Sequence, residues 1–310
     1  MAWNYVDFPP TVDVGSLHPS IYDGAVVRFA DWPAMQEIVD FVDGIIAERY
    51  ALGPIIEAHL KLDRPRLIDL LDGLQRDFSG SKEAARLWRR LFESVGLDSE
   101  VTMRDRLVLR FQLPVDAAGV TTSGVGAPIG FHRDTWGTNL YAQVNWWAPV
   151  YPLAPNRSLA IFPHLWDRVV PNNSAEFDLI DAMQKMRSAI QIRAEDVLPQ
   201  PVLPVDPGTG VPVLIRPGTV IAFSAQHAHG GLPNRSQLIR VSLEARTLLI
   251  ADQVAGRGAH NVDGWARWSS PGMFRRVSDG KPLNEITGGP RVVPFLGPWP
   301  RDSRTTQRRL

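Results

Sequence analysis

Phe131-His132-Arg133-Asp134 places an imidazole and a carboxylate two residues apart. On an extended segment these two side chains point to the same face. A second imidazole comes from a strand end about a hundred residues later, where His227 and His229 have the same parity and can both point inward. Two histidines and one carboxylate on one face of a metal leave the opposite positions open, the arrangement of non-haem Fe(II) oxygenase sites. The sequence therefore predicts a metal centre at this point.

The sequence around these residues resembles the phytanoyl-CoA dioxygenase family of Fe(II)/2-oxoglutarate oxygenases. In that family the distal histidine begins an H-G-x-x-x-N segment and an arginine follows eleven residues later. Here His229-Gly230 is followed by Asn234, and Arg240 stands eleven residues after His229. Residues 145–149 and 156–164 are also similar to the strand and turn that follow H-x-D in the family. The resemblance covers roughly residues 105–250, and the flanking segments match nothing comparable.

The resemblance implies a role for each of these residues. His132, Asp134 and His229 would hold Fe(II) and act in catalysis, with three adjacent positions left for 2-oxoglutarate and O2. Arg240 would bind the distal carboxylate of 2-oxoglutarate, and a planar guanidinium suits a carboxylate because it can donate two parallel hydrogen bonds. Arg246 lies on the same strand face and is the substitute if the register differs. The carboxylate of Asp134 favours hydroxylation over halogenation, because the halogenating relatives lack it.

Two further cosubstrate contacts are expected from the family, at Gln112 and Trp146. Gln112 ends an alternating stretch, residues 106–113, whose polar face can look into a cavity. The family match places Trp146 against the cosubstrate. Strand alternation instead puts Trp146 on the same face as Val144, opposite to Asn145 and Trp147, so the two expectations conflict. The family often has a hydroxyl residue two positions after the distal histidine, and Gly231 here removes that hydrogen bond or leaves it to another group.

The substrate pocket is less well marked. We name as candidate substrate residues Arg110, Trp136, Trp147 and His227. The alternative for His227 is a residue that supports the metal ligands, or a buried core histidine. The alternative for Arg110 is an exposed strand arginine. Many of the ten tryptophans are expected to lie in the core.

Hydrophobic spacing predicts an α+β, mainly β protein. Residues 31–96 contain three amphipathic stretches, the first capped by Asp31 and the last by Gly96, which we interpret as helices supporting a sheet. Strands are expected after residue 105, and the uncharged loop 117–130 should border the metal site. With no internal repeat and no long linker, they indicate a double-stranded β-helix, a jelly-roll barrel of the cupin type. The predicted strands cover residues 106–113, 139–147, 158–163, 188–193, 211–215, 219–225 and 238–249, and residues 1–30 are expected to be irregular apart from a short strand at 25–29.

The 310 residues contain 33 basic and 33 acidic side chains and no cysteine. The balanced charge disfavours nucleic acid and anionic membranes as partners, and the missing thiols leave histidine and carboxylate as metal ligands. No apolar run has the length of a signal peptide or a membrane span. We expect one domain, residues 1–310, in a soluble cytoplasmic protein.

We therefore expect an Fe(II)/2-oxoglutarate-dependent dioxygenase that hydroxylates or otherwise oxidises a C–H bond of a small molecule and converts 2-oxoglutarate to succinate. One alternative is a cupin-type metal-dependent isomerase or metal-binding protein that does not use 2-oxoglutarate. Another is a non-enzymatic jelly-roll binding protein. Residues 251–310 would form either a lid over the iron, together with the loop 117–130, or a structural tail. The identity of the substrate and the oligomeric state stay open.

Overall fold

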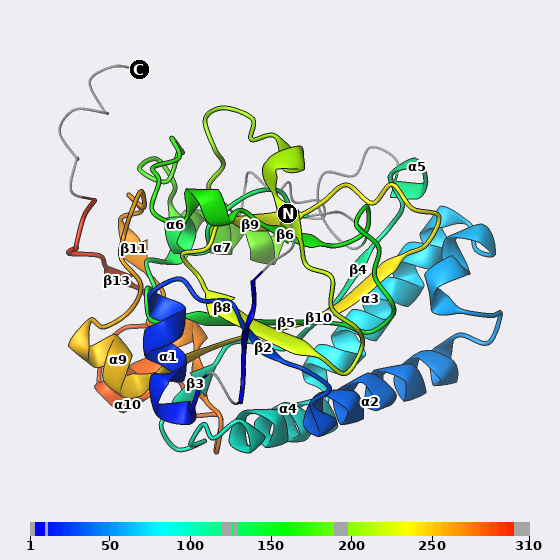
Figure 1. Ribbon diagram of the computed structural model, residues 1–310, viewed down its shortest axis with the longest axis horizontal. Coiled ribbons are helices and arrows are strands. Elements are labelled where there is room, and N and C mark those ends of the chain that lie inside the picture. Colours follow the sequence, from blue (N-terminus) through cyan, green and yellow to red (C-terminus); the bar gives the residue numbers. More distant parts are fainter. Residues whose placement is uncertain (1–3, 10–11, 119–125, 127–128, 189–197, 301–310) are drawn as a thin grey trace.

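A large mixed sheet forms the centre of the molecule in the computed structural model, which describes residues 4–9, 12–118, 126, 129–188 and 198–300 (Figure 1). Seven of its strands follow one another in space, and the eighth, β4, is outside this order and pairs with β10. In spatial order the seven are β1 (Val6–Asp7), β2 (Val27–Phe29), β8 (Val220–Ser224), β5 (Val144–Pro149), β10 (Arg240–Leu249), β3 (Thr102–Arg104) and β12 (Arg275–Arg276), and β4 spans Val108–Gln112.

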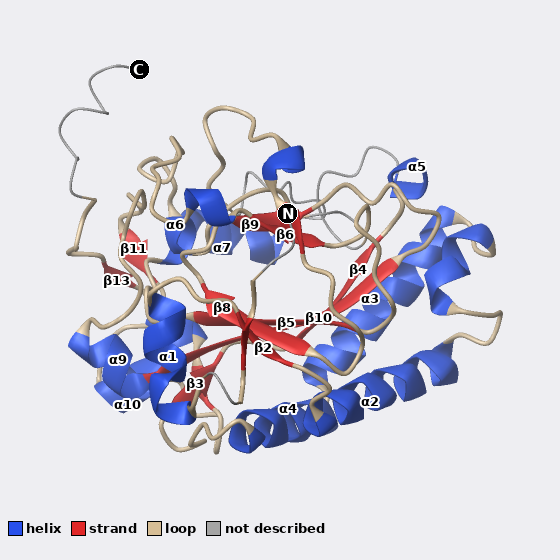
Figure 2. Cartoon of the chain, viewed as in Figure 1, coloured by secondary structure: helices blue, strands red, loops and turns tan. Residues whose placement is uncertain are grey.

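A smaller sheet of three strands lies over one face of the large sheet (Figure 2). It has the order β7 (Val211–Pro212), β6 (Leu159–Ile161) and β9 (His229–Gly231). Apolar side chains from both sheets meet in one buried cluster that includes Trp147, Ile161 and Phe223. The two sheets thus enclose an interior, and β9 carries one of the predicted metal ligands to its edge.

Helices α2 (Pro33–Arg49), α3 (Arg64–Gly80) and α4 (Lys82–Ser94) cover the outer face of the large sheet (Figure 1). Strand alternation explains this layer, because Val241, Leu243 and Ala245 of β10 join the helices in one core while the intervening residues point the other way. Ser81 caps α4 by accepting bonds from the amides of Glu83 and Ala84. The predicted helical layer is present at the predicted place.

The remaining helices are short and lie in the connections. They are α1 (Val14–Tyr22), α5 (Val115–Ala118), α6 (Thr135–Thr138), α7 (Leu179–Ser188), α9 (Ile250–Ala255) and α10 (Leu283–Thr287), with 3-10 turns η1 (Ile55–Leu60), η2 (Pro163–Leu165), η3 (Pro207–Thr209) and η4 (Pro271–Met273). Strands β11 (Trp268–Ser269) and β13 (Val293–Pro294) form a separate pair. Among the described residues, no helix is both long enough and apolar enough to cross a membrane.

Three predictions about elements were wrong in detail, and a fourth falls largely outside the described residues. Residues 14–22, expected to be irregular, form α1, because Asp13 and Ser16 make a capping box that starts a helix despite Pro19. Asp31 does not cap α2: Trp32 holds that position, and Asp31 has a φ of 50° and pairs with Arg216.

The strand expected at 139–147 begins only at Val144, because the chain first makes α6 and then turns at Asn139, whose φ is 50°. Of the strand expected at 188–193, Ser188 ends helix α7 and the other residues lie outside the described part of the chain.

The described part of the C-terminal segment, residues 251–300, packs beside the large sheet. Its strand β12 pairs with β3, and Phe274 and Leu283 share a buried cluster with Met103 and Leu248. This segment is therefore joined to the main body through a core of its own, and residues 301–310 lie outside the description.

Candidate metal centre

His132 and His229 are brought together by the backbone. The amide of each donates to the carbonyl of the other, over 2.9 and 3.0 Å, in an isolated antiparallel bridge. Their rings lie 4.4 Å apart between centroids. Asp134 stands two residues after His132 on the same face, as the alternation predicts. Side-chain donor atoms of His132, Asp134 and His229 all lie within 4.8 Å of one another, and all three residues are buried.

The backbone also fixes which nitrogen of each ring is available to a metal. Nδ1 of His132 lies 2.8 Å from the carbonyl oxygen of Gly130, and Nδ1 of His229 lies 2.9 Å from that of His227. A carbonyl can only accept, so each Nδ1 carries the proton and each Nε2 keeps its lone pair. The two Nε2 atoms lie 3.6 and 3.9 Å from the carboxylate oxygens of Asp134. Histidine ligands of metals in proteins typically have this second hydrogen bond.

Gly230 permits the close approach of the two ligand segments. A Cβ atom at this position would lie 2.9 Å from the carbonyl carbon and oxygen of Gly130 and from the amide nitrogen of Phe131. These are backbone atoms of the segment that leads into His132, and they cannot move aside independently. A glycine after His229 is thus required by the packing that joins the two histidines.

Asp134 is held in one orientation by three donors. Asn145 donates to its Oδ2 over 2.6 Å, Gln143 donates to the same atom over 3.3 Å, and Arg246 donates to Oδ1 over 3.2 Å. Arg246 also reaches Asp105 over 3.3 Å. The carboxylate therefore faces the two imidazoles with its position fixed from behind.

The electrostatics of the site favour an ionised Asp134 and a neutral His229. Burial alone would raise the pKa of Asp134, but Arg246 and the two histidines outweigh it and hold that pKa well below its usual range. Burial, together with His132 nearby, lowers the pKa of His229 to about 4. At neutral pH Asp134 thus offers a negative oxygen and His229 a neutral nitrogen, the protonation states that divalent metal binding requires.

A cavity opens beside the three residues. His132, Asp134 and His229 are part of its wall, so a metal held by them would face the cavity. The other lining residues are Arg110, Ile129, Asn145, Trp146, Trp147, Leu159, Phe223, Gly230, Gly231, Arg240, Glu244, Ala245 and Arg246. Ile129 belongs to the loop 117–130, which was expected to border the site; residues 119–125 and 127–128 of that loop lie outside the described part.

Arg240 enters this cavity from the start of β10 and is only 3% exposed. Its Nε and Nη1 atoms have no hydrogen-bond partner among the described residues. Burial lowers the pKa of Arg240 to about 10, so the guanidinium is still charged at neutral pH. A buried charge with unused donors is costly unless an anion pairs with it. Arg240 is therefore placed and equipped to bind an anionic group in the cavity.

Gln112 lies directly opposite Arg240 across the β4–β10 ladder. Its side-chain nitrogen donates to the carbonyl of Leu232 over 2.7 Å, and its Oε1 has no partner among the described residues. Gln112 is fully buried and is absent from the cavity wall. The structure thus places Gln112 beside Arg240 but outside the cavity wall.

The other arginines of the cavity already have acidic partners. Arg110 makes two hydrogen bonds with Glu244, of 2.5 and 2.8 Å, and it lies in the cavity wall, one of the two orientations that the sequence left open. Arg246 is bound by Asp134 and Asp105. Of the three cavity arginines, Arg240 alone lacks a described acidic partner at ion-pair distance, which favours it over Arg246 as the anchor for a ligand carboxylate.

The structure resolves the conflict over the tryptophans of β5. The indole of Trp146 packs against Phe29 and Phe92 on the helical side of the sheet, and its Nε1 donates to Thr247 over 2.8 Å. Trp146 borders the cavity, but its only polar atom is engaged away from it. Trp147 packs in the cluster between the two sheets and lines the cavity, with an Nε1 that has no partner among the described residues.

Two candidate substrate residues lie away from the cavity wall. Trp136 is fully buried and donates from Nε1 to Asp263 over 2.7 Å. His227 packs against Trp166, and its Nε2 lies 3.2 Å from the carbonyl oxygen of Gly24. Neither residue is in the cavity wall, and His227 is not part of the three-residue cluster. His227 instead supports the centre through its carbonyl, which orients His229.

Several residues of the site were not predicted as functional. Asn145 and Gln143 hold Asp134, Glu244 pairs with Arg110, and Arg133 is fully buried behind the H-x-D segment. Alternation along 143–147 and 240–246 could have placed the first three on the inner face. No signal in the sequence indicated the partner of Arg133, because Asp263 lies 130 positions later in a segment without periodicity.

No known protein-family model matches the chain, and no curated protein sequence matches it significantly. Among solved structures, the non-heme monooxygenase ThoJ is similar with a TM-score of 0.40 at 12% identity, covering 76% of this chain and 77% of its own. EvdO2 from Micromonospora carbonacea var. aurantiaca has a TM-score of 0.40 at 15% identity, covering 77% and 91%. The epimerase SnoN, in complex with Fe3+, alpha ketoglutarate and nogalamycin RO, has a TM-score of 0.36 at 13% identity, covering 76% and 83%. Similarity at this level assigns no family, so the function rests on the geometry of the site.

Proposed function

We propose that the chain is an Fe(II)/2-oxoglutarate-dependent oxygenase that hydroxylates or otherwise oxidises a C–H bond of a small-molecule substrate. One observation supports this most directly: a His–Asp–His donor set and a buried arginine with unused donors line the same cavity. The two sheets that enclose the cavity would be the two sides of the double-stranded β-helix expected from the sequence.

The donor set fits Fe(II) by its chemistry. Two neutral imidazole nitrogens and one carboxylate oxygen form the facial set of non-haem Fe(II) oxygenases, which leaves adjacent positions open to other ligands. When bound there, iron would supply the activation of O2 and the oxidative decarboxylation of 2-oxoglutarate to succinate. His132, Asp134 and His229 would be the ligands, while Asn145, Gln143 and Arg246 would keep the carboxylate in place.

The rest of the cavity fits the cosubstrate. Arg240 would pair with the distal carboxylate of 2-oxoglutarate through charge-assisted hydrogen bonds, each worth about 1.5–3 kcal/mol. Arg110 lies near this anchor, but Glu244 neutralises it, so Arg110 offers no free charge to a second anion. Apolar walls from Leu159 and Phe223 would limit the access of water.

The charges in the cavity wall limit which substrates can bind there. Arg110 and Arg246 are both engaged by acids, and Arg240 is assigned to the cosubstrate. The described wall then offers no further free cation. Trp147, whose Nε1 has no partner among the described residues, remains for contact with a substrate of low charge.

The test of this proposal is turnover. The purified chain, supplied with Fe(II), 2-oxoglutarate and air, should release succinate slowly even without its native substrate, and Asp134→Ala should release none. Protein that binds Fe(II) stoichiometrically but forms no succinate and consumes no O2 with 2-oxoglutarate would instead be a cupin-type metal protein or isomerase. Protein that does not bind metal would be a jelly-roll binding protein.

A further inference from the structure

Arg133, the residue between the two donors of the H-x-D segment, points away from the cavity. Alternation along an extended segment places His132 and Asp134 on one face and Arg133 on the other. The Arg133 side chain has no exposed surface, and it is among the largest fully buried side chains of the described chain. A guanidinium is rarely buried in this way unless every charge and donor is used.

The guanidinium of Arg133 joins four segments of the chain. Its Nε lies 3.1 Å from Oδ1 of Asp263, and its Nη1 donates to the carbonyl of Gln226. Its Nη2 donates to the carbonyls of Leu165 and Arg168 over 2.6 and 2.9 Å. The rigid fork of the guanidinium allows one side chain to hold these groups at once, which a lysine cannot do.

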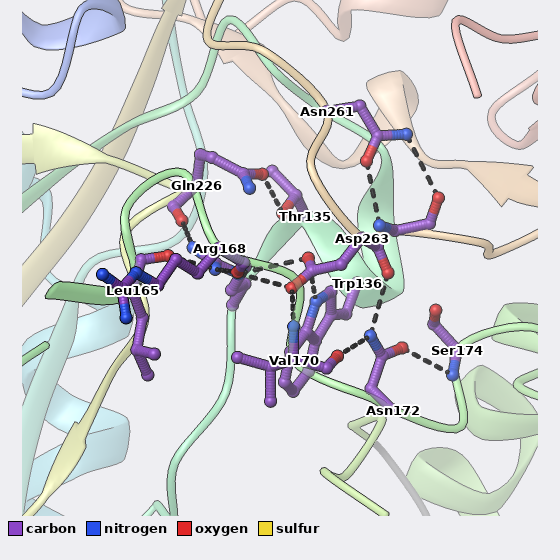
Figure 3. Close-up of polar contacts among 12 residues, drawn as sticks. Thr135, Trp136, Leu165, Arg168, Val170, Asn172, Ser174, Gln226, Asn261 and Asp263 are labelled. Carbon is purple, nitrogen blue, oxygen red and sulfur yellow. Dashed lines mark hydrogen bonds and ion pairs between the residues drawn. The ribbon is translucent and has the colours of Figure 1, made fainter. Parts of the chain in front are cut away.

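Asp263 accepts hydrogen bonds from three other residues (Figure 3). Its carboxylate accepts from the indole of Trp136 over 2.7 Å and from the amide of Val170 over 3.0 Å. Its carbonyl accepts from Asn172 over 2.8 Å. Asp263 is 1% exposed, so the pair has little contact with water and each charge depends on the other.

The network reaches both ligand segments. On one side it holds the backbone between His132 and Asp134 through Arg133. On the other side it holds Gln226, whose carbonyl binds Arg133 and whose Oε1 accepts from Thr135 over 2.9 Å. Gln226 precedes His227, and the carbonyl of His227 orients the ring of His229.

We propose that the Arg133–Asp263 ion pair is the positioning device that sets the H-x-D donors against His229. Asp263 of the C-terminal segment then belongs to the support of the metal centre. Arg133 and Asp263 act through the ligands and do not touch the metal. The inference rests on the proposed function only in that the three donors hold a metal ion, and it does not depend on 2-oxoglutarate.

The test uses Co(II) as a redox-stable probe of the full-length chain. Asp263→Asn should weaken Co(II) binding, measured by visible absorption and equilibrium dialysis, by about 10- to 100-fold, the usual loss when support of a metal ligand is removed. Circular dichroism and denaturant titration give the folded fraction, so that affinity is expressed per folded molecule. Folded Asp263→Asn with wild-type affinity would overturn the proposal.

Two further variants separate positioning from stability. Asn261→Ala is the matched control, because Asn261 binds Gly264 and Pro298 in the same segment but does not contact Arg133. It should lower the unfolding midpoint and leave Co(II) affinity within about twofold, since the support of the ligands is intact.

Arg133→Lys is the second variant, for the case in which Asp263→Asn does not fold. It keeps a positive charge beside Asp263 but loses the forked guanidinium, and it should weaken Co(II) binding about tenfold. Wild-type affinity in folded Arg133→Lys, or an equal loss in Asn261→Ala, would contradict the proposal.

Failure of this inference and failure of the proposed function give different results. Wild-type protein that binds Co(II), and that loses it in Asp263→Asn, supports the positioning role even if 2-oxoglutarate never binds. Wild-type protein that does not bind Co(II) would overturn the metal centre and this proposal together.

Discussion

At the scale of single residues, the backbone carbonyls of Gly130 and His227 decide which nitrogen of each histidine faces the cavity. Because Nδ1 of His132 and of His229 must donate to these carbonyls, the Nε2 atoms are left as ligands. His227 has the same parity as His229, but its ring packs against Trp166. Sequence parity could not separate these two histidines, and the spacing to Arg240 was needed to choose between them.

The first prediction concerns the ligands. Replacing His132, Asp134 or His229 by alanine should remove one of three donors and weaken Fe(II) or Co(II) binding by more than the roughly 100-fold that loss of a supporting residue can cost. His227→Ala should keep the metal, because its carbonyl remains. Metal analysis after anaerobic dialysis gives the result. Loss of metal in His227→Ala with retention in His229→Ala would mean that the ligand was chosen wrongly.

A second residue-scale prediction concerns acid stability and His18. This histidine is 5% exposed, and burial lowers its pKa to about 4 from 6.5, against the attraction of Asp252. The unfolded chain takes up a proton at His18 below pH 6.5 while the folded chain does not until about pH 4. The free energy of unfolding should therefore fall as the pH drops from 6.5 to 4, by about 3 kcal/mol from this residue.

His18→Leu removes this proton uptake and puts an apolar side chain of similar size in the same buried place. Its unfolding free energy, measured by denaturant titration at several pH values, should fall less steeply than that of the wild type over the same range. Parallel curves for the two proteins would show that His18 is not buried in its neutral form.

At the scale of elements, alternation and hydrophobic spacing predicted most of what positions the site. The inner face of β10, with Arg240 and Arg246, and the helical layer of α2, α3 and α4 follow directly from these periods. Helix α1 was not predicted, because Pro19 lies inside it and proline normally argues against a helix, and because its start depends on the Asp13–Ser16 capping box. The late start of β5 depends on the turn at Asn139, whose backbone conformation no periodicity reports.

Gly230 tests whether the pairing of the two ligand segments is required. Gly230→Ala would place a Cβ against the backbone at Gly130 and Phe131, so it should destabilise the fold by about 1–3 kcal/mol and weaken metal binding. Gly44→Ala is the control, because Gly44 lies inside α2 with open space around it and should gain about 0.5–1 kcal/mol. Chemical denaturation and Co(II) titration measure both effects. Unchanged metal affinity in Gly230→Ala would show that the bridge between His132 and His229 is not needed.

At the scale of the whole molecule, the two sheets, the helical layer and the C-terminal segment each contribute to one centre. The sequence predicted a C-terminal lid or tail, and the described residues 251–300 contribute no residue to the cavity wall. They instead contact the H-x-D segment on the side away from the cavity, where Asp263 binds Arg133 and Trp136. A lid formed with the loop 117–130 stays a prediction, since part of that loop and residues 301–310 lie outside the description. Long-range pairs such as Arg133 and Asp263 leave no periodic signal, which is why the sequence could not predict them.

The proposed activity requires one cavity that binds a metal at His132, Asp134 and His229 and a carboxylate at Arg240. The most direct measurement is an anaerobic titration of the Fe(II)-loaded chain with 2-oxoglutarate, followed through the weak visible charge-transfer band of the chelate. The wild type should develop this band with saturation. Arg240→Met should need about 10- to 100-fold more 2-oxoglutarate, because one or two charge-assisted hydrogen bonds are lost, while its Fe(II) affinity stays the same. Arg157→Met, which removes another buried arginine outside the cavity, should titrate like the wild type. No band in iron-loaded wild type, or equal affinity for 2-oxoglutarate in wild type and Arg240→Met, would contradict the account.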